Sequence, residues 1–191
     1  MDERGVTGAK ADALELLVAD HRGFEQQLDL LLRTDVADVD ARQALSRQLT
    51  RGLVEHSVAE EQVLYPAMRE LLPDGDALAD DGIEEHQEVE RLLTEIEKID
   101  VASQHFADMW AAIREDLTHH IADEEKKDFP ALRDRLDAER LAQMGESLAE
   151  AKSNAPTHPH PHAPSKPPFN VVANAGAALL DRLRDAADGS S

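Results

Sequence analysis

Histidine and glutamate recur together in this sequence at a spacing that could build a metal site. Four histidines are each followed by a glutamate four residues later, and the pairs are His21 with Glu25, His56 with Glu60, His86 with Glu90, and His120 with Glu124. Residues i and i+4 of an α-helix lie on one face about one turn apart, so each pair would present an imidazole beside a carboxylate. These two ligand types together suit first-row transition metals such as iron.

The four pairs belong to an internal repeat. His21 and His86 are 65 residues apart, His56 and His120 are 64 apart, and the segments HSVAEEQVLYP and HIADEEKKDFP share the form H-x3-E-E-x4-P. Glutamate makes up 19 of 191 residues, so one such pair would arise by chance for about one histidine in ten and would be read as a surface contact. Four pairs among the six histidines of the first 150 residues, matched in spacing, favour metal binding instead.

Several neighbouring side chains are expected to support the site rather than to bind metal. Glu61 and Glu125 follow Glu60 and Glu124 by one position, about 100° around a helix, so we expect them to orient ligands or to face solvent. We interpret Tyr65 as a core residue or hydrogen-bond donor. His105 and His119 have no glutamate at i+4 and are interpreted as surface residues or as supports of ligands.

Helices must position these pairs, and the apolar residues recur at helical spacing. This pattern predicts helices over residues 9–32, 40–65, 81–99, 103–127 and 131–151, with Asp40 as the N-cap of the second. Pro66 and Pro130 are expected to kink or interrupt the helices that they follow. The segment PDGDALADDG, residues 73–82, is predicted to be a loop, with room for one helical turn inside it.

Four long helices with short connections predict an all-α protein built as an up-down antiparallel four-helix bundle, with extra helical segments at the C-terminus. We divide the chain into a bundle with its following helix, 1–152, a Pro- and His-rich linker, 153–170, and a short amphipathic segment, 171–191. That last segment is expected to dock on the bundle or on a partner. The histidines of the linker, His158, His160 and His162, are interpreted as linker residues rather than as a metal site.

Composition excludes several classes of function. With 40 acidic and 20 basic residues the formal charge is −20, which argues against binding to nucleic acid or to an anionic membrane. The absence of cysteine excludes disulfides, thiolate metal sites and cysteine nucleophiles. The sequence shows neither a signal peptide nor an apolar run long enough to span a membrane, so we expect a soluble cytoplasmic protein, as a monomer or weak homo-oligomer.

The order H … H-x3-E … H … H-x3-E over residues 12–135, with its LYP and DFP endings, resembles the hemerythrin-like (HHE cation-binding) domain. The tail, with its PHPHAP stretch and terminal amphipathic segment, is similar in composition to those of actinobacterial members. The resemblance implies a hemerythrin-like bundle that holds two Fe ions as an oxo- or hydroxo-bridged centre. It implies that His21 and His56 serve one iron, that His86 and His120 serve the other, and that Glu60 and Glu124 are the bridging carboxylates.

The sequence departs from the oxygen-carrying hemerythrins at two positions. Glu90 stands where they carry a histidine, and Glu124 lies at i+4 where they carry an aspartate at i+5. More oxygen ligands favour the ferric state and disfavour reversible dioxygen carriage. Whether Glu25 and Glu90 ligate a metal or accept hydrogen bonds from ligands is open at this level, as is the choice of iron over manganese or zinc.

Other metal-site families do not fit, because the sequence contains neither the E-x-x-H pairs of ferritin-like proteins nor an H-E-x-x-H motif. The resemblance therefore favours a non-haem di-iron protein that reacts with hydrogen peroxide or another small oxidant, such as a catalase-like enzyme. The small molecules expected to bind are H2O2, O2 or NO. Two alternatives without catalysis are a dioxygen-storage module and a sensor of iron or oxygen.

Overall fold

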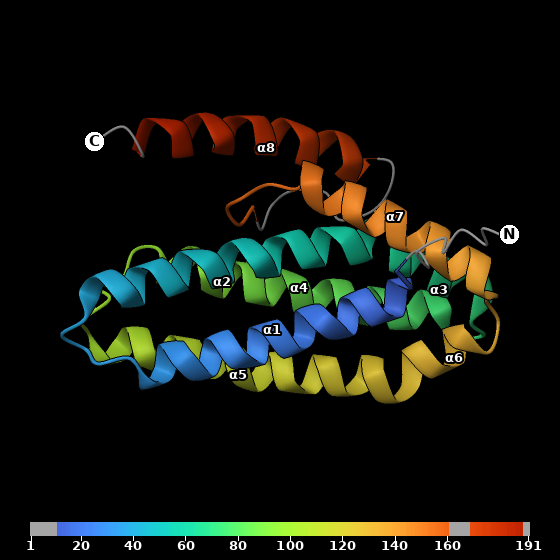
Figure 1. Cartoon of the computed structure of the whole chain (residues 1–191), viewed down its shortest axis with the longest axis horizontal. Coiled ribbons are helices and arrows are strands. Elements are labelled where there is room, and N and C mark those ends of the chain that lie inside the picture. Colours follow the sequence, from blue (N-terminus) through green and yellow to red (C-terminus); the bar gives the residue numbers. More distant parts are fainter. Residues whose placement is uncertain (1–10, 161–168, 189–191) are drawn as a thin grey trace, which may run out of the picture.

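The structure is a computed structural model that describes residues 11–160 and 169–188 of the 191-residue chain. The described residues form helices and loops without strands, as the sequence predicts. Four long helices run up and down as an antiparallel bundle (Figure 1): α1 (Ala13–Arg33), α2 (Val39–Ala59), α4 (Gly75–Ile96) and α5 (Gln104–Asp123). Within those residues no helix combines the length and hydropathy needed to cross a membrane.

Side-chain caps fix where the long helices begin. The carboxylate of Asp12 accepts hydrogen bonds from the first turn of α1, and the Ser103 hydroxyl does the same for α5. The predicted cap of the second helix is wrong by two residues, because Asp38 and not Asp40 accepts the hydrogen bond from the Ala41 N–H. Asp40 lies inside the first turn, where its charge favours the helix dipole.

The helices α2 and α5 do not break at the prolines that follow them. Each passes through a five-residue π-helical turn, η1 (Glu60–Leu64) and η2 (Glu124–Asp128), and continues as α3 (Tyr65–Leu71) or α6 (Phe129–Arg133). The N–H groups that follow the turns bond five residues back, to the carbonyls of Glu60 and Glu124. Pro66 and Pro130 then occupy the first turn of the next segment, where a missing N–H is tolerated.

The loop predicted over residues 73–82 is wrong, because α4 already begins at Gly75. Arg69 of α3 pairs with Asp76 and Asp80, which offsets the acidic charge of this segment, and Ala79 is fully buried. Gly75 allows α3 and α4 to approach closely, since a Cβ there would lie 1.9 Å from the Met68 carbonyl oxygen. Burial and ion pairing thus outweigh the turn signals of the local sequence.

Two further helices follow the bundle. α7 (Ala138–Asn154) begins seven residues later than predicted, because residues 131–133 belong to α6, and it packs against α1 and α2. α8 (Phe169–Asp188) lies beyond the end of α7 (Figure 1), where Arg182 donates to the Ser153 carbonyl. Asp181 of α8 accepts hydrogen bonds from the backbone N–H groups of Thr157 and His158.

The histidines of the linker contact carboxylates within the described part of the chain. His158 contacts Glu97 and Asp185, and His160 contacts Asp181. These residues do not form a group that could hold a metal ion there. His162 lies outside the described residues, and the division into bundle, linker and terminal segment stays a prediction.

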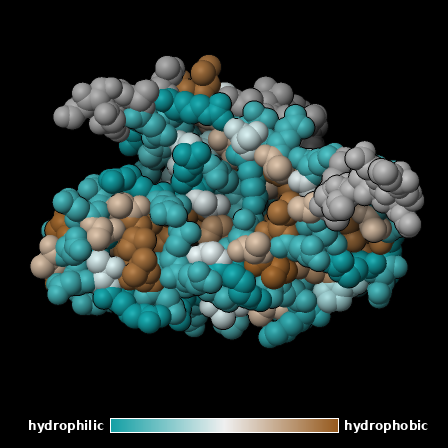
Figure 2. All heavy atoms as spheres, viewed as in Figure 1, coloured by the Kyte–Doolittle hydropathy of each residue, from teal (hydrophilic) through white to brown (hydrophobic). Residues whose placement is uncertain are grey.

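Two apolar clusters leave a polar layer between them in the bundle. One joins the start of α1 to α3, α6 and α7 and includes Leu17 and Leu132; the other, with Phe106 and Trp110, fills the opposite end. The inward histidines and glutamates lie between these clusters. The face in Figure 2 is mostly hydrophilic, with apolar side chains in small separate patches, as the charge of −20 leads one to expect.

Candidate metal centre

Four helices of the bundle each bring one histidine to the same polar layer. His21, His56, His86 and His120 come from α1, α2, α4 and α5, and none is more than 7% exposed. They approach in pairs: the ring centroids of His21 and His56 are 5.0 Å apart, and those of His86 and His120 are 5.1 Å apart. The pairing follows the internal repeat, because each half of the bundle supplies one pair.

Glu60 lies at the centre of this layer and is fully buried. One carboxylate oxygen is 3.1 Å from Nε2 of His56, and the other is 3.2 Å from Nε2 of His86 and 3.8 Å from Nε2 of His120. Glu60 thus touches histidines of both halves. Its position in the first residue of η1 sets it at the widened turn of the helix.

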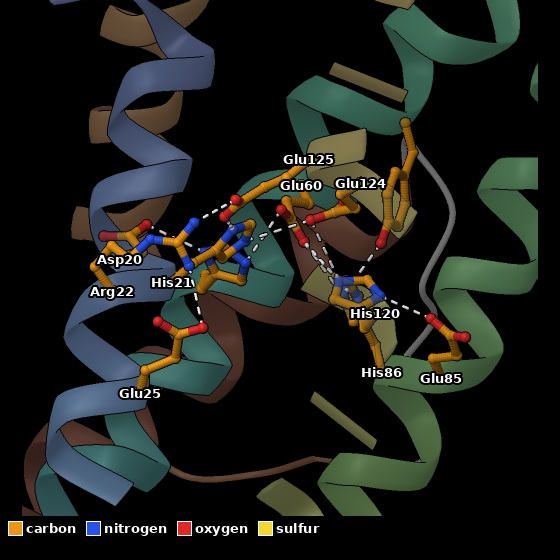
Figure 3. A network of polar contacts seen from close by, with 12 residues as sticks. Asp20, His21, Arg22, Glu25, Glu60, Glu85, His86, His120, Glu124 and Glu125 are labelled. Carbon is orange, nitrogen blue, oxygen red and sulfur yellow. Dashed lines mark hydrogen bonds and ion pairs between the residues drawn. The ribbon is translucent and has the colours of Figure 1, made fainter. Parts of the chain in front are cut away.

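These side chains form two overlapping groups that could hold metal ions (Figure 3). Each group has ligand atoms within 4.8 Å of one another, and the groups are His21, His56, Glu60 and Glu124 in one and Glu60, His86 and His120 in the other. Glu124 links them a second time, since its carboxylate lies 3.4 Å from His21 and 3.6 Å from His120.

Several buried nitrogen and oxygen atoms of these side chains lack hydrogen-bond partners, as expected of atoms that coordinate metal ions. Both carboxylate oxygens of Glu60 and of Glu124 lack hydrogen bonds, as do Nε2 of His21, His56 and His120. Buried polar atoms normally have such partners, and charged ones are costly without them. Cations coordinated by these atoms would satisfy them.

Comparison with known proteins agrees with this geometry. The family model of the hemerythrin HHE cation binding domain matches residues 12–132. The chain belongs to the hemerythrin HHE family. A hemerythrin-like protein of Schizosaccharomyces pombe is 33% identical over 172 residues, which cover 90% of this chain and 84% of that protein.

Two further similarities cover only part of this chain. A crystal structure of a hemerythrin HHE cation-binding domain protein from Mycobacterium kansasii has a TM-score of 0.64 at 22% identity, covering 75% of this chain and 86% of that one. This likeness shows the shared fold. A DNA nickase of Nostoc is 32% identical over 106 residues, 56% of this chain but only 30% of the nickase, so most of that protein has no counterpart here.

In the hemerythrin centre, buried carboxylates and histidines shift the pKa values of one another. Burial disfavours charge on His56, but the Glu60 carboxylate and the contact with Asp20 raise the pKa of His56 to about 9. Burial likewise opposes the ionisation of Glu60, and the neighbouring histidines outweigh it and hold the pKa of Glu60 well below its usual range. Without metal, His56 and Glu60 therefore form a buried pair of imidazolium and carboxylate ions.

Two carboxylates that the sequence reasoning missed hold the histidines of α2 and α5. Nδ1 of His56 lies 3.1 Å from Asp20 on α1, and Nδ1 of His120 lies 2.7 Å from Glu85 on α4. A signal for them exists in the repeat, since Asp20 precedes His21 as Glu85 precedes His86. Each therefore orients the histidine of the neighbouring helix and turns Nε2 toward the centre.

Glu125 does the same for His21, in line with the supporting role predicted for it, whereas Glu61 lies beside His86 without a hydrogen bond. Nδ1 of His21 is 2.8 Å from Glu125, and Nδ1 of His86 is 3.4 Å from Glu61. All four histidines thus face a carboxylate at Nδ1, in an arrangement that repeats between the two halves.

This arrangement predicts that Asp20→Ala weakens metal binding although Asp20 touches no other member of the metal groups. Without its acceptor the His56 ring loses its fixed orientation, and we expect metal affinity to fall roughly 10- to 100-fold. Competition with a calibrated chelator measures this affinity. Glu15→Ala, an exposed carboxylate on the same helix, is the matched control, and equal affinities for the two variants would contradict the orienting role.

The structure does not bring Glu25 or Glu90 into either metal group. Glu25 is 52% exposed, and its carboxylate pairs with the Arg22 guanidinium (Figure 3). Glu90 is half-buried beside Glu61, and burial and this second carboxylate raise its pKa to about 7. Metal ligation by these two residues therefore has no support in the geometry.

Tyr65 is a buried hydrogen-bonding residue, as predicted. Its hydroxyl lies 3.1 Å from Nε2 of His86, and its ring stacks on that histidine. Gly82 makes this possible, because a Cβ there would lie 2.5 Å from the hydroxyl oxygen. Burial and then the charges of Glu60 and Glu124 raise the pKa of Tyr65 well above its usual value, so the phenol keeps its proton.

Proposed function

We propose that this hemerythrin-domain protein binds two iron ions and reacts with hydrogen peroxide. His21 and His56 would hold one ion and His86 and His120 the other, with Glu60 and Glu124 between them and an oxo or hydroxo group completing the bridge. The observation that carries this proposal is the position of Glu60, which is shared by both candidate metal groups and is fully buried without hydrogen bonds.

The chemistry of the ligand set favours peroxide over reversible dioxygen carriage. An iron pair exchanges two electrons, which suffices to reduce one peroxide to two waters and to oxidise a second to dioxygen. The carboxylates opposite Nδ1 of the histidines make the imidazoles more basic, which stabilises the higher oxidation states. The Tyr65 phenol holds a proton beside His86, at the edge of the site.

The test is metal content followed by peroxide turnover on the full untagged chain, purified without chelators or nickel columns so that the tail histidines do not mislead. We expect about two irons per chain and one dioxygen released for every two peroxides consumed, measured with an oxygen electrode. His56→Ala should lose most of the iron and the turnover. His105→Ala, an exposed histidine on α5, should lose neither.

Other outcomes would point elsewhere. Zinc or manganese in place of iron would keep a metal site but contradict the iron enzyme. Two irons without peroxide turnover would favour dioxygen storage or sensing. A folded chain without metal would overturn the proposal. The cytoplasmic location, the lack of nucleic-acid partners and the oligomeric state stay predictions.

A further inference from the structure

A pocket leads from the surface to the histidines between α2, α4 and α5. Its volume is about 190 Å³, and three of the four inward histidines, His56, His86 and His120, line it. Its walls also include the apolar side chains of Leu53, Val89 and Leu117. Acidic residues, among them Glu85, Glu88 and Asp116, line it as well. The pocket therefore connects solvent with the candidate metal groups.

The internal repeat places a larger side chain at the equivalent position on the opposite side of the bundle. Val89 lies three residues after His86, and its counterpart after His21 is Phe24. Phe24 is buried, and its ring packs edge-on against His56 with centroids 5.3 Å apart. A phenyl ring thus occupies one half at the position where the other half has the smaller valine.

A second pair of residues differs in the same sense. Asp116 lies four residues before His120, and its counterpart before His56 is Gly52. A Cβ at Gly52 would lie 3.0 Å from the Phe24 ring, so the glycine makes room for the phenyl group. The pair Phe24 and Gly52 closes one side, whereas Val89 and Asp116 line an open pocket on the other.

α7 reinforces this asymmetry by packing on α1 and α2. Its Lys152 pairs with Asp20, the counterpart of Glu85. Glu85 itself is 55% exposed. Asp20, which holds His56, is therefore covered by Lys152, whereas the equivalent Glu85 is open to water.

The charges that line the pocket disfavour anions. Glu88 is paired with Arg91 and Glu85 with His120, whereas Asp116 adds negative charge to a chain that already carries −20. Burial and then the neighbouring carboxylates of Glu88 and Glu115 raise the pKa of Asp116, in agreement with a negative local potential. A small uncharged molecule would enter without this repulsion.

We propose that this pocket is the access path to the metal centre, that it selects small uncharged oxidants over anions, and that Val89 keeps it open. The inference rests on the proposed function in requiring iron at the histidines. In this inference the residues that line the pocket, and not the metal ligands, select which class of substrate reaches the centre.

The first test combines Val89→Phe and Asp116→Gly, which gives the pocket the two residues found at the equivalent positions of the other half. Iron content should be unchanged, while nitric oxide binding to the ferrous protein, followed by stopped-flow absorbance, should slow by roughly tenfold or more. Val89→Ala should bind at least as fast as the unaltered chain. Leu30→Phe, an exposed position on α1, controls for the added ring. Unchanged binding rates in the double variant would overturn the access path.

Charge selection is tested with Asp116→Asn. The rate of azide binding should rise roughly threefold to tenfold, with the rate for nitric oxide unchanged. The charge-matched control is Glu139→Gln on α7, an exposed carboxylate that does not line the pocket. Equal effects on azide and nitric oxide would contradict selection by charge.

A readout without metal separates this inference from the proposed function. Xenon should occupy the pocket in pressurised crystals of the apo protein and be absent after the double substitution. If peroxide turnover fails but nitric oxide binding slows as expected, the proposed reaction is wrong and the access path stands. If turnover is present while xenon and nitric oxide are unaffected, the access path is wrong and the reaction stands.

Discussion

Glu60→Gln should remove both metals from the protein. Glu60 is shared by the two candidate metal groups, and an amide offers one neutral oxygen where the carboxylate offers two charged ones. We expect metal content to fall from about two ions per chain to nearly none, because affinity should drop by roughly 100-fold or more when the shared carboxylate is lost. Mass spectrometry of the purified protein measures the content.

The matched control is Glu25→Gln, which makes the same chemical change four residues after another inward histidine. Glu25 is half exposed and pairs with Arg22, so this variant should keep its metals. Circular dichroism verifies that both variants stay helical. Retention of both ions by the Glu60 variant, or their loss from the Glu25 variant, would contradict the site as the structure places it.

Removing the metals should lower the melting temperature by about 10 °C at neutral pH. A ligand at a thousand times its dissociation constant stabilises the folded state by about 4 kcal/mol, and 1 kcal/mol shifts the melting temperature of a domain of this size by about 2–4 °C. Calorimetry of iron-loaded and iron-free protein measures the shift. The control is His56→Ala, whose melting temperature should not respond to added iron.

The shift should grow as the pH rises. In the metal-free protein the pKa of His56 is raised from 6.5 to about 9, so its stabilising contribution is fully present below pH 6.5 and is lost as the pH rises through 9. Metal binding needs the neutral imidazole, so protons compete with metal over this same range. The pKa values of His86 and His120 are raised as well, which adds to the effect.

The measurement is the melting temperature of both forms from pH 6 to 9, together with proton release on iron binding in weak buffer at pH 7. The difference between the forms should widen with pH, and protons should be released. A constant difference without proton release would mean that the histidines are already neutral in the metal-free protein.

Local spacing in the sequence was enough to predict the helices that carry the site and the family of the fold. The i, i+4 pairs and their repeat place an imidazole on each of four helices, and this is a property of short segments. The inward positions of His21, His56, His86 and His120 follow, because apolar residues of the same helices share that face.

The sequence could not decide which of the four paired glutamates lie in the centre. Residues four apart on a helix are offset by about 40°, and whether that offset leads toward the centre or toward solvent depends on how each helix is rotated about its axis. Tertiary packing sets this rotation, and it places Glu60 and Glu124 inside, Glu25 on the surface and Glu90 beside Glu61.

Contacts between helices were likewise beyond the sequence pattern. Asp20 and Glu85 hold histidines 36 and 35 residues away, and no local period relates such positions. The sequence by itself thus determined the residue types of the candidate metal groups and the helical bundle, since both follow from helical spacing. The tertiary structure alone decided which carboxylates converge, which orient the histidines and which side holds the pocket. These depend on side-chain packing, in which Phe24 contacts His56 in one half whereas the equivalent Val89 lines the pocket in the other.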